Sequence, residues 1–203
     1  IMLMALAGCA SFPDEKIAKV ENLPDVSHYQ TKPNVAIDLK FYRGNPEDSN
    51  AIEMNQLTPK LQEMTSKILD EAQLFESYTF DLFEKNEVNY VIKMHFYNHG
   101  STGGAAISGF LSGFTLGIIP GMATDNYTLK LDVNQGDKNI IEQVSDDALN
   151  TYIGIWFIPI MGNTPEKGFD EVISNMIKDS LSNMVESKQL HYAAISPLLI
   201  NKG

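Results

Sequence analysis

The chain has 203 residues, of which 43% are hydrophobic and 20% are charged, so it is long enough to bury the core of a folded domain. Its 26 acidic and 15 basic residues give a formal net charge of −11, which repels nucleic-acid phosphates and anionic lipid head groups. We therefore expect no nucleic-acid partner. The single cysteine excludes a disulfide within the chain and a zinc site built from several thiolates.

The first eight residues form an apolar run without a charged side chain. The run is shorter than the roughly 20 residues that span a bilayer as a helix. Such a run is typical of the hydrophobic and cleavage regions of a secretory signal peptide. We therefore expect residues 1–8 to be part of a signal peptide.

The run ends in Leu6-Ala7-Gly8-Cys9, which resembles the lipobox of bacterial lipoproteins at every position. The resemblance implies cleavage before Cys9 and acylation of its thiol by palmitate-type chains, which would hold the protein on a membrane. Because Ala10 rather than aspartate follows the cysteine, the resemblance also implies an outer-membrane lipoprotein that faces the periplasm, if the source is Gram-negative. The alternative is a buried segment of small residues with an incidental thiol.

The chain after Cys9 divides into three parts. Residues 9–33 hold three prolines among scattered charges and predict a lipidated tether, residues 34–190 predict the folded domain, and residues 191–203 predict a C-terminal tail. Alternating apolar residues predict strands over 35–42, 78–82, 90–97, 127–133 and 140–149, with a hairpin turn at 134–137. The pairs Thr58-Pro59 and Thr164-Pro165 predict two helices in which threonine is the N-cap.

The order β-α-β-β-insertion-β-β-α predicts a single α+β (α/β) domain, with a mixed, mostly antiparallel sheet of about five strands and two main helices on one face. This order is similar to that of an envelope group that includes the curli-secretion lipoproteins, the Tol translocation protein N-terminal domain and the lipoprotein activators of penicillin-binding proteins. The similar residues are the helix of 61–75, the strand of 78–82 and Val88-Asn89-Tyr90-Val91-Ile92, in which Asn89 stands where the group often has aspartate. The resemblance covers about half of the chain and implies a fold more than an activity.

Two uncharged apolar segments stand out. Residues 103–124 lie within an apolar insertion of residues 100–126, and residues 152–162 hold the only tryptophan. In an antiparallel meander both segments leave the same end of the sheet and would together form one apolar platform. Glycines recur there every fourth residue, which on a helix would permit close packing; they are Gly109, Gly113, Gly117 and Gly121. The candidate partner or membrane contacts are Phe110, Leu111, Phe114, Ile118, Trp156 and Phe157.

Three interpretations of this platform remain open. The two segments extend the core, or they dock on an envelope protein or a second copy of the chain, or residues 103–124 enter the bilayer as part of an oligomeric export pore. Pro120 and the glycines make a membrane-spanning helix in residues 103–124 unfavourable.

Side chains with the spacing of a reactive site are scarce. His95 and His99 would lie about 13 Å apart on a strand, which is too far for one metal ion. Asp146 and Asp147 would point to opposite faces of a strand. No Gly-x-Ser-x-Gly motif occurs, and Gly100-Ser101-Thr102-Gly103-Gly104 lacks the lysine of a phosphate loop. We therefore expect no catalytic residue, no metal and no cofactor.

The sequence thus predicts a non-enzymatic lipoprotein that is held on the membrane by its N-terminal lipid and that assembles with an envelope protein partner or with itself. The alternatives are an oligomeric export or pore component and, less favoured by the sequence, an envelope hydrolase.

Overall fold

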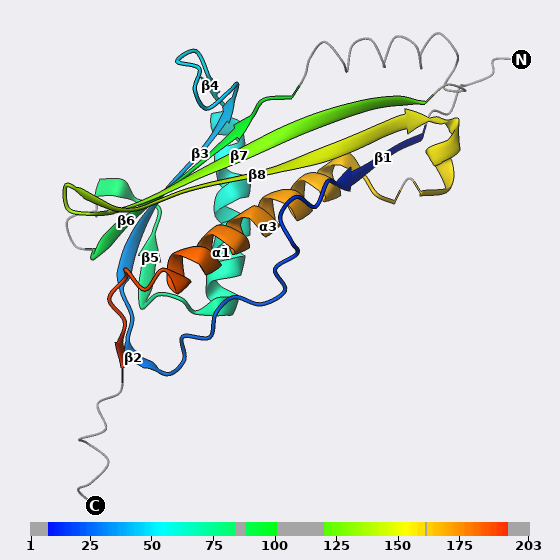
Figure 1. The fold of residues 1–203 in the computed structure, drawn as a ribbon. Helices are drawn as coiled ribbons and strands as arrows, with labels where there is room; N and C mark the ends of the chain where they lie inside the picture. Colours follow the sequence, from blue (N-terminus) through cyan, green and yellow to red (C-terminus); the bar gives the residue numbers. More distant parts are fainter. Residues whose placement is uncertain (1–7, 84–87, 101–119, 161, 195–203) are drawn as a thin grey trace, which may run out of the picture.

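The computed structural model describes residues 8–83, 88–100, 120–160 and 162–194, and Figure 1 shows one open sheet with two long helices packed against it. The strands are Gly8–Pro13 (β1), Tyr29–Thr31 (β2), Asn34–Arg43 (β3), Ile52–Glu53 (β4), Ser77–Thr79 (β5), Tyr90–Asn98 (β6), Gly121–Gln135 (β7), Lys138–Gly154 (β8) and Ala193–Ala194 (β9). The α-helices are Thr58–Ala72 (α1) and Pro165–Glu186 (α3), and the 3₁₀ helices are Asn55–Leu57 (η1) and Ile155–Ile160 (η3). No helix within these ranges is both long and apolar enough to cross a membrane.

The main sheet has seven strands in the order β1-β8-β7-β6-β3-β4, with β5 paired to β3. The β3–β6 and β3–β5 pairs are parallel, and every other pair is antiparallel. The parallel β3–β6 pair requires the crossover that contains α1. The predicted α+β class, mixed sheet and two helices are therefore confirmed, and the sheet has more strands than expected.

The core lies between one face of the sheet and the two helices. Alternate residues of β3, β6 and β7 point into it, as the alternation predicted; they are Val35, Ile37, Leu39, Phe41, Tyr90, Ile92, Met94, Phe96, Tyr127, Leu129, Leu131 and Val133. One face of α3 lies against them, with Val172, Ile173, Met176, Ile177, Leu181 and Met184 buried. The opposite face of these strands carries charged and aromatic side chains.

The two helices begin where the sequence predicts, but only one threonine is a cap. Thr164 is the N-cap of α3, and its side chain accepts a hydrogen bond of 3.2 Å from the backbone N–H of Lys167. Thr58, in contrast, is the first residue of α1, whose N-cap is Leu57 and has no side-chain bond. The 3₁₀ turn of η1 leads directly into α1, so Thr58 already has helical backbone angles and cannot cap the helix.

The largest difference from expectation concerns residues 9–33. Residues 8–13 form β1, an edge strand that pairs with β8 from Gly8–Gly154 to Pro13–Leu149. Further along, Val26 is buried in the core and Tyr29–Thr31 pairs with Ala193–Ala194, a part of the predicted C-terminal tail. This segment therefore packs on the domain instead of hanging free as a tether.

Several strand ends also differ. The β7–β8 hairpin turns at Gly136 as predicted, with φ of +57°. Its strands, however, continue to Gly121 and Gly154, and so take residues from both apolar segments. β5 ends at Thr79, so the strand expected over 78–82 is shorter.

Candidate functional site

The predicted lipid attachment site lies at one end of the sheet, together with both apolar segments. In one row across three strands, Cys9 of β1 pairs with Ile153 of β8, which pairs with Gly121 of β7. The first apolar segment returns to the sheet at this row, and the second leaves it there. The expectation that both segments join the same end of the sheet is confirmed.

The described candidate contacts differ in exposure. Trp156 in η3 is 64% exposed, whereas Phe157 is half-buried, with its ring centroid 5.5 Å from that of Tyr152. Ile160, which is not one of the predicted contacts, is 43% exposed in the same 3₁₀ helix. Gly121 is buried in β7, so the four-residue glycine repeat ends in a strand and not on a helix. The remaining candidates lie outside the described residues, namely Phe110, Leu111, Phe114, Ile118, Gly109, Gly113 and Gly117.

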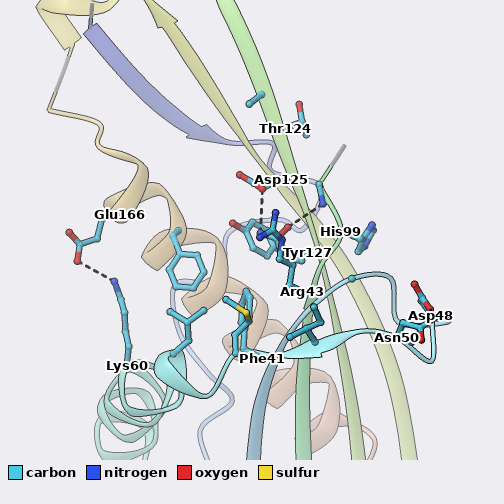
Figure 2. Close-up of a pocket in the computed structure, with 18 residues that line it drawn as sticks. Phe41, Arg43, Asp48, Asn50, Lys60, His99, Thr124, Asp125, Tyr127 and Glu166 are labelled. Atoms are coloured by element: carbon cyan, nitrogen blue, oxygen red, sulfur yellow. Dashed lines mark hydrogen bonds and ion pairs between the residues drawn. The ribbon is translucent and has the colours of Figure 1, made fainter. Parts of the chain in front are cut away.

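A cavity of about 810 Å³ opens beside this end, between the sheet and the first turns of α1 and α3 (Figure 2). Its floor is a cluster of three aromatic rings, Phe41 of β3, Tyr127 of β7 and Phe169 of α3. Their ring centroids lie 5.9 to 6.4 Å apart. Burial raises the pKa of the Tyr127 phenol, which therefore stays protonated at neutral pH. The floor is consequently apolar and uncharged.

The mouth of the cavity is polar because the residues of β3 and β7 that face the helices change from apolar to charged at this end of the sheet. Arg43 follows Phe41 in the inward row of β3, and Asp125 precedes Tyr127 in that of β7. Asn98 lies between them and donates a 3.3 Å hydrogen bond to Asp125 Oδ1. Arg43 forms no ion pair with any described residue, and the same is true of Asp125. Arg43, Asp125 and Asp48 of the cavity lining therefore have no ionic partner among the described residues.

Lys60 closes the helix side of the cavity, as Figure 2 shows. Its Nζ lies 2.6 Å from Asp170 Oδ1, 3.3 Å from Glu166 Oε1 and 5.4 Å from the Phe169 ring centroid. Burial lowers the pKa of Lys60, but the bonds to the two carboxylates outweigh it, so the pKa is raised. Lys60 therefore links α1 to α3 through ion pairs that compensate its charge, whereas Arg43 has no ion pair with a described residue.

The two histidines of the sequence motif each have their own partner: His95 lies on the outer face of β6, and His99 follows β6 and lines the cavity. His95 Nε2 lies 3.1 Å from Asp38 Oδ2, a hydrogen bond that lowers the pKa of Asp38. His99 Nε2 lies 2.9 Å from Thr128 Oγ1. The structure does not bring the two histidines to a common site, and no group of three potential ligand side chains in the described ranges could hold a metal ion.

The chain of contacts from His99 through Thr128 continues to Asp146, because the threonine hydroxyl donates a 2.5 Å hydrogen bond to Asp146 Oδ1. A nucleophile activated by histidine would donate its proton to the imidazole instead. Thr128 is also only 4% exposed. This geometry is that of a structural link between strands.

Asp147 points to the opposite face of β8 from Asp146, as the strand alternation predicted. There it is buried and accepts a hydrogen bond from the backbone N–H of Lys16.

The cavity was missed by sequence reasoning. Phe41 and Tyr127 lie in the strands predicted over 35–42 and 127–133, and Arg43 lies just beyond the first of these strands. The available signal was the change from apolar to charged residues at the end of two inward rows, Phe41 to Arg43 and Tyr127 to Asp125.

No protein-family model matches this sequence, and no curated protein matches it either. Among solved structures, it is similar to a Xanthomonas campestris protein of family DUF330 (9% identity, 84% of this chain and 96% of the other, TM-score 0.41). It is also similar to a minor lipoprotein from Acinetobacter baumannii (10% identity, 81% of this chain and 96% of the other, TM-score 0.40). A third similar structure is the PelC dodecamer from Paraburkholderia phytofirmans (9% identity, 87% of this chain and 98% of the other, TM-score 0.35). These identities are too low to transfer a function from any of the three proteins.

Proposed function

We propose that this protein is a lipid-anchored, non-enzymatic binding module of the cell envelope, with the cavity as its binding site. The observation that carries the proposal is the row Cys9–Ile153–Gly121. It joins the cysteine of the lipobox-like motif to the end of the sheet where Trp156 and Ile160 are exposed. A cysteine acylated there would place these side chains beside the lipid.

The anchor compensates for the charge of the protein. With a formal net charge of −11, the chain is repelled by an anionic membrane surface, so adhesion requires apolar contact or covalent lipid. Two or more acyl chains give stable anchoring, whereas one gives only marginal binding. Exposed tryptophan at the same end suits the boundary between lipid and water.

The proposal of a binding role instead of catalysis rests on the cavity itself. Its volume lies within the range of about 300–1,000 Å³ that is usual for ligand pockets, and its floor is formed by three aromatic rings. The charged side chains that line it are Arg43, Asp48 and Asp125, which have no ionic partner among the described residues, and Lys60, which is paired with Glu166. This set suits recognition of a ligand better than proton transfer.

The anchor is tested by expressing the full precursor in a Gram-negative host with radioactive palmitate. We expect label on the wild type and none on Cys9→Ser. A matched control, Cys9→Ser with Ser27→Cys, moves the thiol to an exposed position outside the motif and should also remain unlabelled. Density fractionation should place the labelled protein in the outer membrane. Equal label on wild type and Cys9→Ser would refute the anchor.

A further inference from the structure

The cavity is amphipathic along its depth. Its floor offers the three rings of Phe41, Tyr127 and Phe169, and its mouth offers the charges of Arg43 and Asp125. A ligand that matches both must have an apolar part long enough to reach the rings and a charged part that stays in water at the mouth. Burial of methylene groups against these rings removes apolar surface from water, so an alkyl chain suits the floor.

The charges at the mouth indicate what kind of head group fits. Arg43 is free to bind a phosphate, which guanidinium groups bind through paired hydrogen bonds. Among the described residues, Asn98 alone donates a side-chain hydrogen bond to Asp125, so Asp125 is free to bind an ammonium group. A purely anionic head group would be repelled by Asp125 and by the net charge of −11. A zwitterionic head group satisfies both side chains.

The cavity also lies close to the proposed anchor. In a second row across the sheet, Ser11 of β1 pairs with Thr151 of β8, which pairs with Ala123 in the cavity wall. Neighbouring strands lie about 4.8 Å apart, so Ala123 is about 10 Å from β1. Ser11 belongs to the face that contacts α3, because a Cβ added to Gly168 would lie 3.2 Å from Ser11 Cβ. The cavity therefore opens on the same face, near the place where lipid would be attached.

We propose that the cavity binds one acyl chain of a zwitterionic phospholipid, with the lipid phosphate at Arg43 and its ammonium group at Asp125. This deepens the proposed function, on which it rests, by naming the ligand class of the same cavity. A whole phospholipid is too large for a cavity of about 810 Å³, so the second acyl chain remains outside.

The binding test uses the full chain with Cys9→Ser, which cannot be acylated. The protein is incubated with vesicles of equal parts dioleoyl phosphatidylethanolamine and dioleoyl phosphatidylglycerol, separated from them, and analysed by native mass spectrometry. We expect one phospholipid per chain and an excess of phosphatidylethanolamine of about tenfold, since only its head group carries an ammonium group that can pair with Asp125. Equal amounts of the two lipids, or no bound lipid, would overturn the proposal.

Three variants locate the lipid. Ala123→Trp fills the cavity and should abolish uptake, whereas the matched control Val144→Trp, on the outer face where Val144 is 57% exposed, should leave it unchanged. Arg43→Gln should lower uptake of both lipids about tenfold, and Asp125→Asn should remove the preference for phosphatidylethanolamine. Circular dichroism shows whether Ala123→Trp is folded. If it is not, Arg43→Gln decides, because Arg43 is exposed.

Unchanged uptake by a folded Ala123→Trp variant, or by Arg43→Gln, would overturn the assignment of the cavity. The outcome is independent of the anchor, because the protein used for uptake carries no acyl group. Failure of palmitate labelling would refute the proposed anchor, whereas failure of uptake would refute only the ligand.

Discussion

Substitution of Gly168 by alanine tests how α3 packs on the end of the sheet that carries Cys9. A Cβ at this position would lie 2.6 Å from Leu149 Cδ1 and 3.2 Å from Ser11 Cβ. Alanine in place of glycine gains about 1 kcal/mol of helix propensity. Overpacking a buried site costs about 1–3 kcal/mol, and Leu149 is only 3% exposed. We therefore expect Gly168→Ala to lower the free energy of unfolding by up to about 2 kcal/mol.

The sign of this effect should reverse when Leu149 is truncated. Leu149→Ala alone should cost about 2–5 kcal/mol, but it removes the shorter of the two contacts. In that background Gly168→Ala should stabilise the protein by about 1 kcal/mol, because the helix gain remains and the new methyl group fills part of the cavity. Urea unfolding followed by circular dichroism measures all four proteins. The control Gly162→Ala, with no heavy atom within 4 Å of its added Cβ, should change stability by less than about 0.5 kcal/mol. Stabilisation of the wild type by Gly168→Ala, or additive effects in the cycle, would refute this packing.

Three further predictions concern charges and the hairpin. Burial raises the pKa of Asp147 despite the hydrogen bond from the Lys16 backbone. The wild type should therefore gain stability as the pH falls from neutral through that pKa. Thermal unfolding at a series of pH values should show that Asp147→Asn removes this gain. The bond to His95 lowers the pKa of Asp38, so its contribution is present above the unfolded pKa and is lost as the pH falls through the folded pKa. Asp38→Asn should therefore show a smaller loss of stability on acidification, and an unchanged acid-side slope would contradict this. Gly136→Ala should cost about 1–2 kcal/mol in urea unfolding because φ is +57°, although a Cβ there meets no neighbour; a neutral effect would contradict the turn geometry.

The elements that the sequence predicts well are those whose pattern depends on one buried face. The alternation of Val35, Ile37, Leu39 and Phe41 needs only a core on one side of a strand, and the structure has one there. The helical spacing of α3 is equally local. The turn at Gly136 follows from the need for a left-handed residue between two strands.

β1 could not be predicted because its partner is distant in the sequence. Residues 8–13 have no clear alternation, since both Ala10 and Ser11 are buried in the structure. They form a strand because β8 continues to Gly154 and offers a free edge about 140 residues later, where Ser11 Oγ lies 2.8 Å from Thr151 Oγ1. Local propensity cannot report such an edge.

The cavity is unpredictable for a different reason. Each of its floor residues obeys the core pattern, and only the packing of three separate elements shows that the core is not filled at one end. Phe41, Tyr127 and Phe169 come from β3, β7 and α3, and the space above them exists because the β7–β8 hairpin continues past Asn98, the last residue of β6. A periodic pattern gives the face of each element and not the volume between them.

The packing of β1 changes what an anchor at Cys9 would do. A free tether over residues 9–33 would let the domain turn in any direction above a membrane. With β1 paired to β8, acyl chains on Cys9 would begin at the end of the sheet, and the exposed side chains of Trp156 and Ile160 would meet lipid at the same end. The orientation of the cavity toward the bilayer would then depend on one short strand and on the contact between Ser11 and α3 at Gly168. Stability at Gly168 and access of the cavity to lipid are therefore expected to be coupled.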